Sequence, residues 1–164
     1  MMEPIQQCVF VALGSNLAEP ERQVTQAFAA LAQLPQTRLL AQSSLYRSAP
    51  VGYTEQADFM NAVAQLETGL APHDLLHSLL GIERTFGRVR DFRNAPRTLD
   101  LDLLLYGGLM FHEPGLTLPH PRMHERAFVL LPLVEIAPDC EIPGKGRAAE
   151  WLARVGDQAI TRVA

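Results

Sequence analysis

The sequence has few cysteines and no long hydrophobic run. Its two cysteines, Cys8 and Cys140, have no spacing typical of a metal or redox motif. They suit a reducing compartment better than a disulfide framework, so we expect a cytoplasmic protein. The apolar runs are only a few residues long and do not predict a membrane span. The segment Met1-Met2-Glu3-Pro4 lacks the basic residues of a secretory signal.

The composition is that of an ordinary folded domain. The 164 residues are 48% hydrophobic and 20% charged, which excludes a disordered or low-complexity chain. This length is enough for one domain with a substantial core and too short for two ordinary ones. We therefore expect residues 1–164 to form a single domain.

Lysine is nearly absent, and arginine takes its place. Lys145 is the only lysine, and arginine supplies 13 of the 14 basic residues. The net charge of −4 argues against a nucleic-acid partner, but residues 84–97 alone carry +4, so the rest of the chain carries −8. The planar arginine fork matches phosphate and carboxylate oxygens, so this window is a candidate anion site. A solvated loop with weak surface ion pairs explains the charge equally well.

Hydrophobic periodicity predicts an alternation of strands and helices. A turn and cap at Gly14-Ser15-Asn16, followed by Glu19-Pro20, predict a helix start after the first strand. Pro72 opens a second helix, and Gly87 is its expected C-terminal glycine. Strands are expected at 8–13, 37–47, 59–66 and 99–105, with a shorter one near 109–111, and further helices at 126–136 and 147–155.

The order of these elements predicts the fold class. Strand, helix, strand, strand, helix, strand is the βαββαβ order of the ferredoxin-like α+β arrangement. We expect a mostly antiparallel sheet with two helices packed on one face and C-terminal helical additions. The other face would then be free to carry a site.

Two carboxylates in the strand at 99–105 are candidate metal ligands. Alternation would turn Leu99, Leu101, Leu103 and Leu105 inward and place Asp100 and Asp102 together on the opposite face. Carboxylates this close repel each other unless a cation lies between them, and Mg²⁺ prefers such oxygen ligands. An amphipathic strand with a solvated acidic face is the alternative.

The arginine window directly precedes this acidic strand. Arg97 lies three residues before Asp100, and Arg88 and Arg90 lie at the other end of the same loop. Magnesium-binding acids beside phosphate-binding arginines are typical of phosphoryl-group transfer. The Walker A loop and the protein-kinase signatures are absent, so a nucleotide site would be built differently.

Several segments together resemble one enzyme family. The segments Leu13-Gly14-Ser15-Asn16, Asp58-Phe59-Met60-Asn61-Ala62, Pro96-Arg97-Thr98-Leu99-Asp100-Leu101-Asp102, Pro119-His120 and Arg126-Ala127-Phe128 occur in that family's order. On these residues the chain resembles the 6-hydroxymethyl-7,8-dihydropterin pyrophosphokinases of folate biosynthesis. The resemblance runs from residue 9 to about residue 138.

The resemblance implies a ferredoxin-like monomer that transfers pyrophosphate from ATP to the hydroxymethyl oxygen of the pterin and releases AMP. It implies that Asp100 and Asp102 hold two Mg²⁺ ions, and that Arg88 and Arg97 act on the phosphates as catalytic residues. The loop 87–97 could close over ATP. This reaction needs no covalent nucleophile, and the residues predict none.

The resemblance also implies two sets of binding residues. The ATP-binding positions are Glu83, Arg88, Arg90, Arg97, Leu103, Thr117, His120 and Arg126. The pterin-binding positions are Ser48, Ala49, Val51, Phe59, Asn61 and Phe128, with Phe128 stacking on the pterin and Asn61 reading its edge.

Other activities of the same residues define two alternatives. Asn94-Ala95 stands where family members often carry Trp-Gly, which motivates a non-catalytic pterin or nucleotide sensor. The aspartate pair and the arginines alone would also suit a metal-dependent phosphohydrolase. Release of AMP that depends on the pterin distinguishes the pyrophosphokinase from both.

Overall fold

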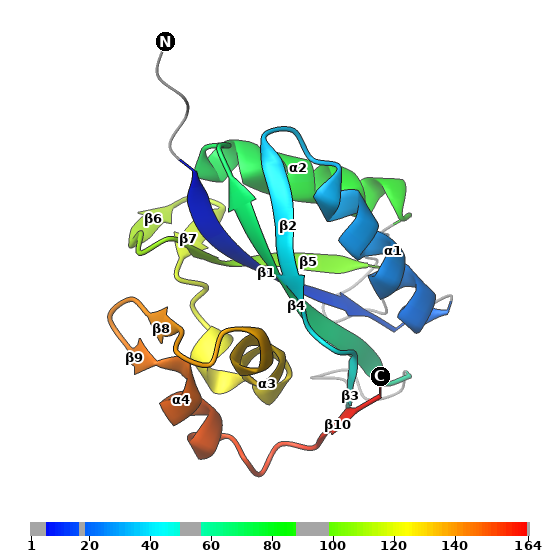
Figure 1. Cartoon of the computed structure of the whole chain (residues 1–164). Helices are drawn as coiled ribbons and strands as arrows, with labels where there is room; N and C mark the ends of the chain where they lie inside the picture. Colours follow the sequence, from blue (N-terminus) through cyan, green and yellow to red (C-terminus); the bar gives the residue numbers. More distant parts are fainter. Residues whose placement is uncertain (1–5, 17–18, 50–56, 88–98, 164) are drawn as a thin grey trace.

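The computed structural model describes residues 6–16, 19–49, 57–87 and 99–163. A sheet runs through the middle of the molecule, with helices on both of its faces (Figure 1). Its strands are β1 (Gln7–Ser15), β2 (Thr37–Gln42), β3 (Tyr46–Ser48), β4 (Phe59–Thr68), β5 (Asp100–Tyr106) and β10 (Ile160–Arg162). The helices are α1 (Pro20–Ala32), α2 (Pro72–Thr85), α3 (Ala127–Ile136) and α4 (Ala148–Arg154), with the short 3₁₀ turn η1 (Met123–Glu125).

The sheet has the order β10-β3-β4-β1-β5, and β2 also pairs with β4. Each of these pairs is antiparallel, so the predicted α+β class with a mostly antiparallel sheet is confirmed. The first strand continues beyond its predicted end, because β1 includes Gly14 and Ser15. The predicted turn and cap at Gly14-Ser15-Asn16 is therefore wrong. The residue before α1 is instead Glu19, which has a positive φ of 60° and no side-chain cap.

Helices α1 and α2 cover one face of the sheet with an apolar layer (Figure 1). Apolar residues at helical spacing supply this layer, namely Val24, Phe28 and Leu31 on α1 and Leu75 and Leu79 on α2. Gly87 follows α2 with a φ of 78°, and its N–H donates to the carbonyl of Arg84, as expected of a C-terminal glycine.

The predicted strand at 37–47 is two strands that pair with different ends of β4. The break is at Ser43, whose hydroxyl accepts the N–H of Val63 at 2.9 Å and donates to the carbonyl of Ser44 at 2.8 Å. A side chain that bonds to nearby backbone groups competes with the regular ladder, which explains the interruption.

Helix α3 packs on the second face of the sheet, so that face is open at one end only. Phe10, Val63 and Leu104 join α3 and α4 in a second apolar cluster. The sequence indicates this in retrospect, because α3 is apolar on nearly every side, and such a helix has to be buried. The helices predicted at 126–136 and 147–155 are confirmed as α3 and α4.

Strand β5 contains a bulge that changes which face its last leucines occupy. Phe10 pairs with Leu105, but Val11 pairs with Leu103, so Leu104 is the extra residue. Leu101 and Leu103 pack toward α1 and α2 as predicted, whereas Leu105 packs with the α3 cluster. The prediction for Leu105 is wrong because a bulge breaks simple alternation.

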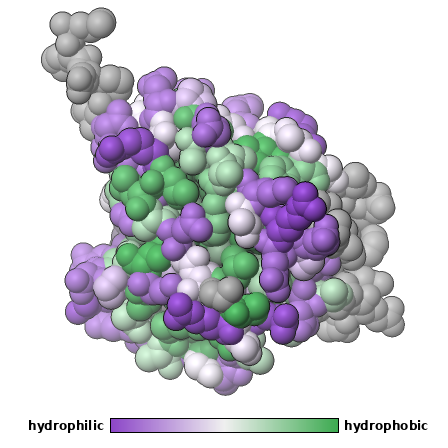
Figure 2. Space-filling model, turned by 45° about the vertical axis from the view of Figure 1, so that its right-hand side comes forward, coloured by the Kyte–Doolittle hydropathy of each residue, from purple (hydrophilic) through white to green (hydrophobic). Residues whose placement is uncertain are grey.

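A small hairpin follows β5. The strand expected near 109–111 is β6 (Phe111–Glu113), which pairs with β7 (Leu116–Leu118) in a separate sheet. A second short pair, β8 (Glu141–Ile142) with β9 (Gly146–Arg147), precedes α4. On the surface, hydrophobic areas lie among hydrophilic side chains (Figure 2). Among the described residues, no helix is both long and apolar enough for a membrane span.

Candidate active site

Asp100 and Asp102 lie on the sheet face that α3 only partly covers. Asp102 pairs with Ala12, a member of the α3 cluster, and Asp100 pairs with Gly14, two residues further along β1. The prediction that both carboxylates share one face is therefore confirmed. Gly14 also pairs with Asn61 on β4, so one row across the sheet runs from Asp100 through Gly14 to Asn61.

Gly14 keeps the middle of this row free of side chain. A Cβ atom added there would lie 3.6 Å from Oδ1 of Asn61 and 3.9 Å from Cδ1 of Phe59. The glycine thus leaves space between the acids on β5 and the amide on β4. Its place in the Leu-Gly-Ser-Asn motif was the only sequence signal for this role.

The bulge in β5 holds His120 beside the acids. The carbonyl of Leu104, the bulged residue, accepts the N–H of His120 at 2.9 Å. Nδ1 of His120 accepts the N–H of Arg122 at 3.1 Å, so the neutral ring carries its proton on Nε2. Burial, together with the charge of Arg126, lowers the pKa of His120 to about 4 despite the opposing influence of Asp100. His120 is therefore a neutral hydrogen-bond donor near pH 7.

Arg126 interacts electrostatically with both acids. Burial lowers the pKa of its guanidinium, and Asp102 and Asp100 oppose that shift by favouring the charged form. The guanidinium carbon lies 5.5 Å from the ring centre of Phe128. The structure thus brings together four predicted residues, namely Asp100, Asp102, His120 and Arg126.

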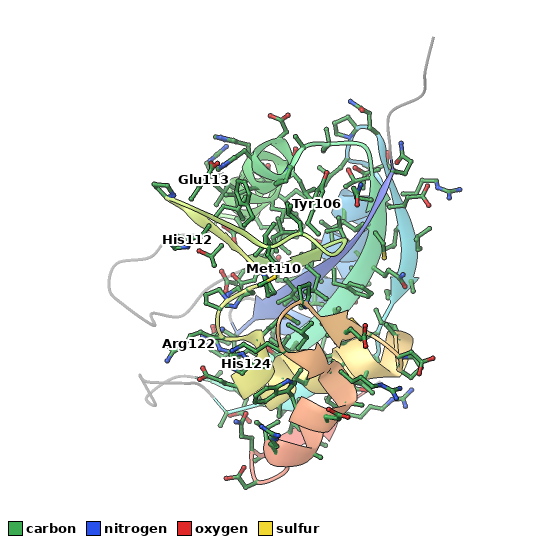
Figure 3. The ribbon with its side chains drawn as sticks, turned by 90° about the vertical axis from the view of Figure 1, so that its left-hand side faces the viewer. Tyr106, Met110, His112, Glu113, Arg122 and His124 are labelled. Atoms are coloured by element: carbon green, nitrogen blue, oxygen red, sulfur yellow. The ribbon has the colours of Figure 1, made fainter. Side chains whose placement is uncertain are left out.

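One cavity, of about 500 Å³, lies between β5 and the β6–β7 hairpin. Leu103, Thr117 and His120, which the resemblance assigns to an ATP site, all line it, and so does Asp102, a predicted metal ligand. Nδ1 of His112 lies 2.9 Å from Oγ1 of Thr117. Figure 3 shows His112 and Glu113 on the hairpin, with Arg122 on the same side of the molecule below them.

A second cavity, of about 450 Å³, lies between β3, the start of α3 and the C-terminal segment. Ser48, Ala49 and Phe128 of the predicted pterin set line it, together with Arg126. Gln158 and Ala159 also line this cavity and were missed, because nothing in their local sequence distinguishes them from surface residues.

Asn61 adjoins the second cavity through Ser48. It is 4% exposed, and its Nδ2 donates to Oγ of Ser48 at 2.7 Å. Phe59 pairs with Ser48 on the neighbouring strand and is partly buried. These two predicted residues are therefore next to the cavity-lining Ser48, although they are not part of the lining itself.

Glu135 on α3 ties this helix to β3 and to the residue Ser44 that precedes it. Its carboxylate accepts hydrogen bonds from the Tyr46 hydroxyl at 2.7 Å and the Ser44 hydroxyl at 2.8 Å. Burial and the bond to Glu135 raise the pKa of Tyr46 to about 12. Burial alone would raise the pKa of Glu135, but the bonds from Tyr46 and Ser44 outweigh it and lower that pKa.

Glu83 holds strand β5 through a hydrogen bond to its backbone. Its side chain on α2 is only 3% exposed, and Oε2 accepts the N–H of Leu101 at 2.7 Å. Strand β5 is the edge of the sheet, so this carboxylate satisfies a backbone donor between Asp100 and Asp102. The remaining predicted site residues, Val51, Arg88, Arg90 and Arg97, lie outside the described residues.

The donor set of the site fits magnesium. Among the described residues there is no group of three or more His, Cys, Asp or Glu side chains suited to a metal ion. A closed zinc-type cage is thus not formed in that part of the chain. Two half-buried carboxylates on one strand face, next to a cavity, suit Mg²⁺, which usually takes one or two carboxylates and completes its shell with phosphate oxygens and water.

Paired carboxylates on an antiparallel sheet, with a neutral histidine and an arginine beside two cavities, are features expected of the phosphoryl-group transferases. A family model described as 7,8-dihydro-6-hydroxymethylpterin-pyrophosphokinase matches residues 10–138. The chain belongs to this family, which confirms the resemblance seen in the sequence.

Individual relatives agree with this assignment. A 2-amino-4-hydroxy-6-hydroxymethyldihydropteridine pyrophosphokinase of Pseudomonas aeruginosa is 51% identical over 157 residues, which cover 96% of this chain and 97% of the relative. The enzyme of the same name from Haemophilus influenzae is 44% identical over 154 residues, covering 94% and 96%. A Plasmodium falciparum HPPK-DHPS crystal structure shares the fold with a TM-score of 0.73 at 12% identity, and the match covers 94% of this chain but 43% of that one.

Proposed function

We propose that this chain transfers pyrophosphate from ATP to the hydroxymethyl group of 6-hydroxymethyl-7,8-dihydropterin, giving AMP and the pterin diphosphate for folate biosynthesis. The observation that carries the proposal is the position of Asp100 and Asp102. Asp102 lines the cavity beside the hairpin, and both acids influence Arg126, which lines the other cavity. Two substrates bound in the two cavities would meet at these acids.

The cavity beside the hairpin is the proposed ATP site. His120 would donate a hydrogen bond from Nε2, and Leu103 and Thr117 would contribute to the wall. Arg126 would neutralise phosphate charge between the cavities. Arg88, Arg90 and Arg97 complete the proposed ATP set, and Arg88 and Arg97 would stabilise charge in the transition state. Glu83 joins this set by fixing the strand that carries the acids.

The cavity beside α3 is the proposed pterin site. Phe128 offers a ring for stacking, and Ser48 and Ala49 line the same cavity. Val51 completes the proposed pterin-binding set. Asn61 would read the edge of the pterin, with Phe59 beside it. In the reaction, the hydroxymethyl oxygen bonds to the β-phosphorus, the bond from that phosphorus to the bridging oxygen of AMP breaks, and the hydroxyl proton is lost to solvent.

Asp100 and Asp102 would hold two Mg²⁺ ions, which neutralise the phosphates and favour the reactive form of the hydroxyl. The chain's own contribution is positioning and charge, which is what phosphoryl transfer demands. We place the reaction in the cytoplasm, supported by the free thiols of Cys8 and Cys140. We also propose that the chain acts as a monomer, as the resemblance implies.

One assay tests the proposed function. The purified chain is incubated with ATP, Mg²⁺ and 6-hydroxymethyl-7,8-dihydropterin, and AMP and inorganic phosphate are measured. AMP that forms only when the pterin is present supports the proposal. Phosphate release without pterin would identify a phosphohydrolase, and tight pterin binding without turnover would identify a sensor.

A further inference from the structure

Gln158, near the C-terminal end of the chain, bonds to the backbone on both sides of Arg126. Its Oε1 accepts the N–H of Ala127 at 2.9 Å, and its Nε2 donates to the carbonyl of Glu125 at 2.8 Å. We infer that Gln158 is a positioning residue that fixes Arg126 and Phe128 in the pterin-side cavity. The inference rests on the proposed function and names a determinant outside residues 10–138, the segment that matches the family.

The bond to Ala127 replaces a missing helix cap. Helix α3 starts at Ala127, and its N-cap residue, Arg126, makes no side-chain capping bond. The first N–H groups of a helix need partners from outside the helix. Gln158 supplies one of them from a distant part of the chain, so the start of α3 depends on it.

Gln158 is itself held from both sides. Its own N–H donates to the carbonyl of Val155 at 3.1 Å, which closes a turn after α4. Two residues further on, β10 pairs with β3, and Ile160 lies opposite Ser48. The Gln158 side chain therefore connects the Ser48 wall of the cavity to the Phe128 wall, and it lines the cavity itself.

This arrangement explains why an exposed amide can affect a reaction. Because water can replace its bonds, their loss costs little folding stability. The loss does release the backbone that aims the Arg126 guanidinium toward the acids and the Phe128 ring toward the cavity. Small displacements of positioning groups reduce rates strongly, so catalysis should suffer more than stability does.

The test compares Gln158→Ala with Asp157→Ala, a substitution of the exposed neighbouring residue. We expect Gln158→Ala to lower kcat/KM for the pterin about tenfold, the loss typical of one or two neutral hydrogen bonds, with little change in Tm. Asp157→Ala should leave kcat/KM within twofold of the unaltered chain. Gln158→Glu keeps the acceptor for the Ala127 N–H. Its kcat/KM should therefore lie between that of Gln158→Ala and that of the unaltered chain.

A double-substitution cycle shows whether Gln158 acts through Arg126. The double variant should lose much less kcat/KM than the product of the two fold-losses seen in Gln158→Ala and Arg126→Ala alone. Hydrogen exchange at the Ala127 amide, measured without substrates, should become faster in Gln158→Ala. If Gln158→Ala does not fold, the same exchange and kinetic measurements on Gln158→Glu decide the matter.

Two outcomes would overturn the inference. One is a Gln158 variant with unaltered kcat/KM and unaltered Ala127 exchange, and the other is full multiplicativity with Arg126→Ala. Failure of the proposed function looks different, because the unaltered chain would then form no pterin-dependent AMP while the exchange at Ala127 would still respond to Gln158.

Discussion

The two faces of the sheet are built from the same strands but differ in what they carry. The face under α1 and α2 is apolar along its length, from Leu66 and Val11 to Leu13 and Met60. The face under α3 begins with an equally apolar cluster and ends in Asp102, Asp100 and Asn61. One face stabilises the fold, and the open end of the other face carries the residues of the proposed active site.

The difference follows from how the two faces are covered. Amphipathic helices α1 and α2 exclude water from the first face, so a charge there needs a polar partner, as the buried Glu83 carboxylate has in the Leu101 N–H. Helix α3 begins at Ala127, and the cavity opens around its first residues. The acids can therefore keep contact with solvent and ligand.

Removing either acid should have the largest effect on activity. Asp100→Ala and Asp102→Ala should each abolish AMP formation, a loss of more than about 100-fold, because phosphate charge is no longer neutralised. Both variants should still fold, since neither carboxylate belongs to the two apolar clusters. AMP release and thermal unfolding measure the two effects. A near-normal rate in either variant would contradict the metal assignment.

Matched leucines on the two faces should separate stability from catalysis. Leu79 on α2 and Leu130 on α3 are both fully buried. Substitution of either by alanine should cost about 2–5 kcal/mol in denaturant unfolding. Only Leu130→Ala should also lower kcat/KM per folded molecule, because α3 carries Phe128. Equal kinetic losses in both variants would remove the distinction between the faces.

Acidification should lower the free energy of unfolding through protonation of His120. Its pKa is about 4 in the folded chain and about 6.5 when unfolded. Between these values only the unfolded chain binds the proton, so stability rises with pH across this interval and falls on acidification. The contribution is on the order of 3 kcal/mol. Unfolding free energies of the unaltered chain and of His120→Asn, measured from pH 4 to 7, should converge toward the acid end. Parallel curves would rule out this contribution.

The surface pair that links α2 to the hairpin should matter least. Nε2 of His73 lies 2.7 Å from Oε2 of Glu113, but the side chains are 45% and 51% exposed. Glu113→Gln should change the free energy of unfolding by less than about 1 kcal/mol. The KM for ATP should stay within twofold, although Glu113 lines the hairpin cavity. A larger increase in the KM for ATP would show that the pair of His73 and Glu113 contributes to ATP binding.

Much of the fold could be predicted from local pattern. The strand at 59–66 and the starts of α1 and α2 could be predicted from periodicity and from the prolines, and Met60, Ala62 and Leu66 of that strand share the helix-covered face, as alternation requires. The break at Ser43 and the bulge at Leu104 could not be predicted, because each depends on hydrogen bonds to distant strands. The bulge moved Leu105 to the other face and gave His120 its backbone partner, and the break at Ser43 divided one predicted strand into β2 and β3.

By itself, the sequence determined the class of the fold, the family and the shared face of Asp100 and Asp102. These properties depend on residue type and on spacing within one element. Tertiary structure alone decided that α3 closes most of the second face, that Gly14 lies between the acids and Asn61, and that Gln158 caps α3. Such contacts join residues far apart along the chain, and no local pattern specifies which distant partner a backbone group will find.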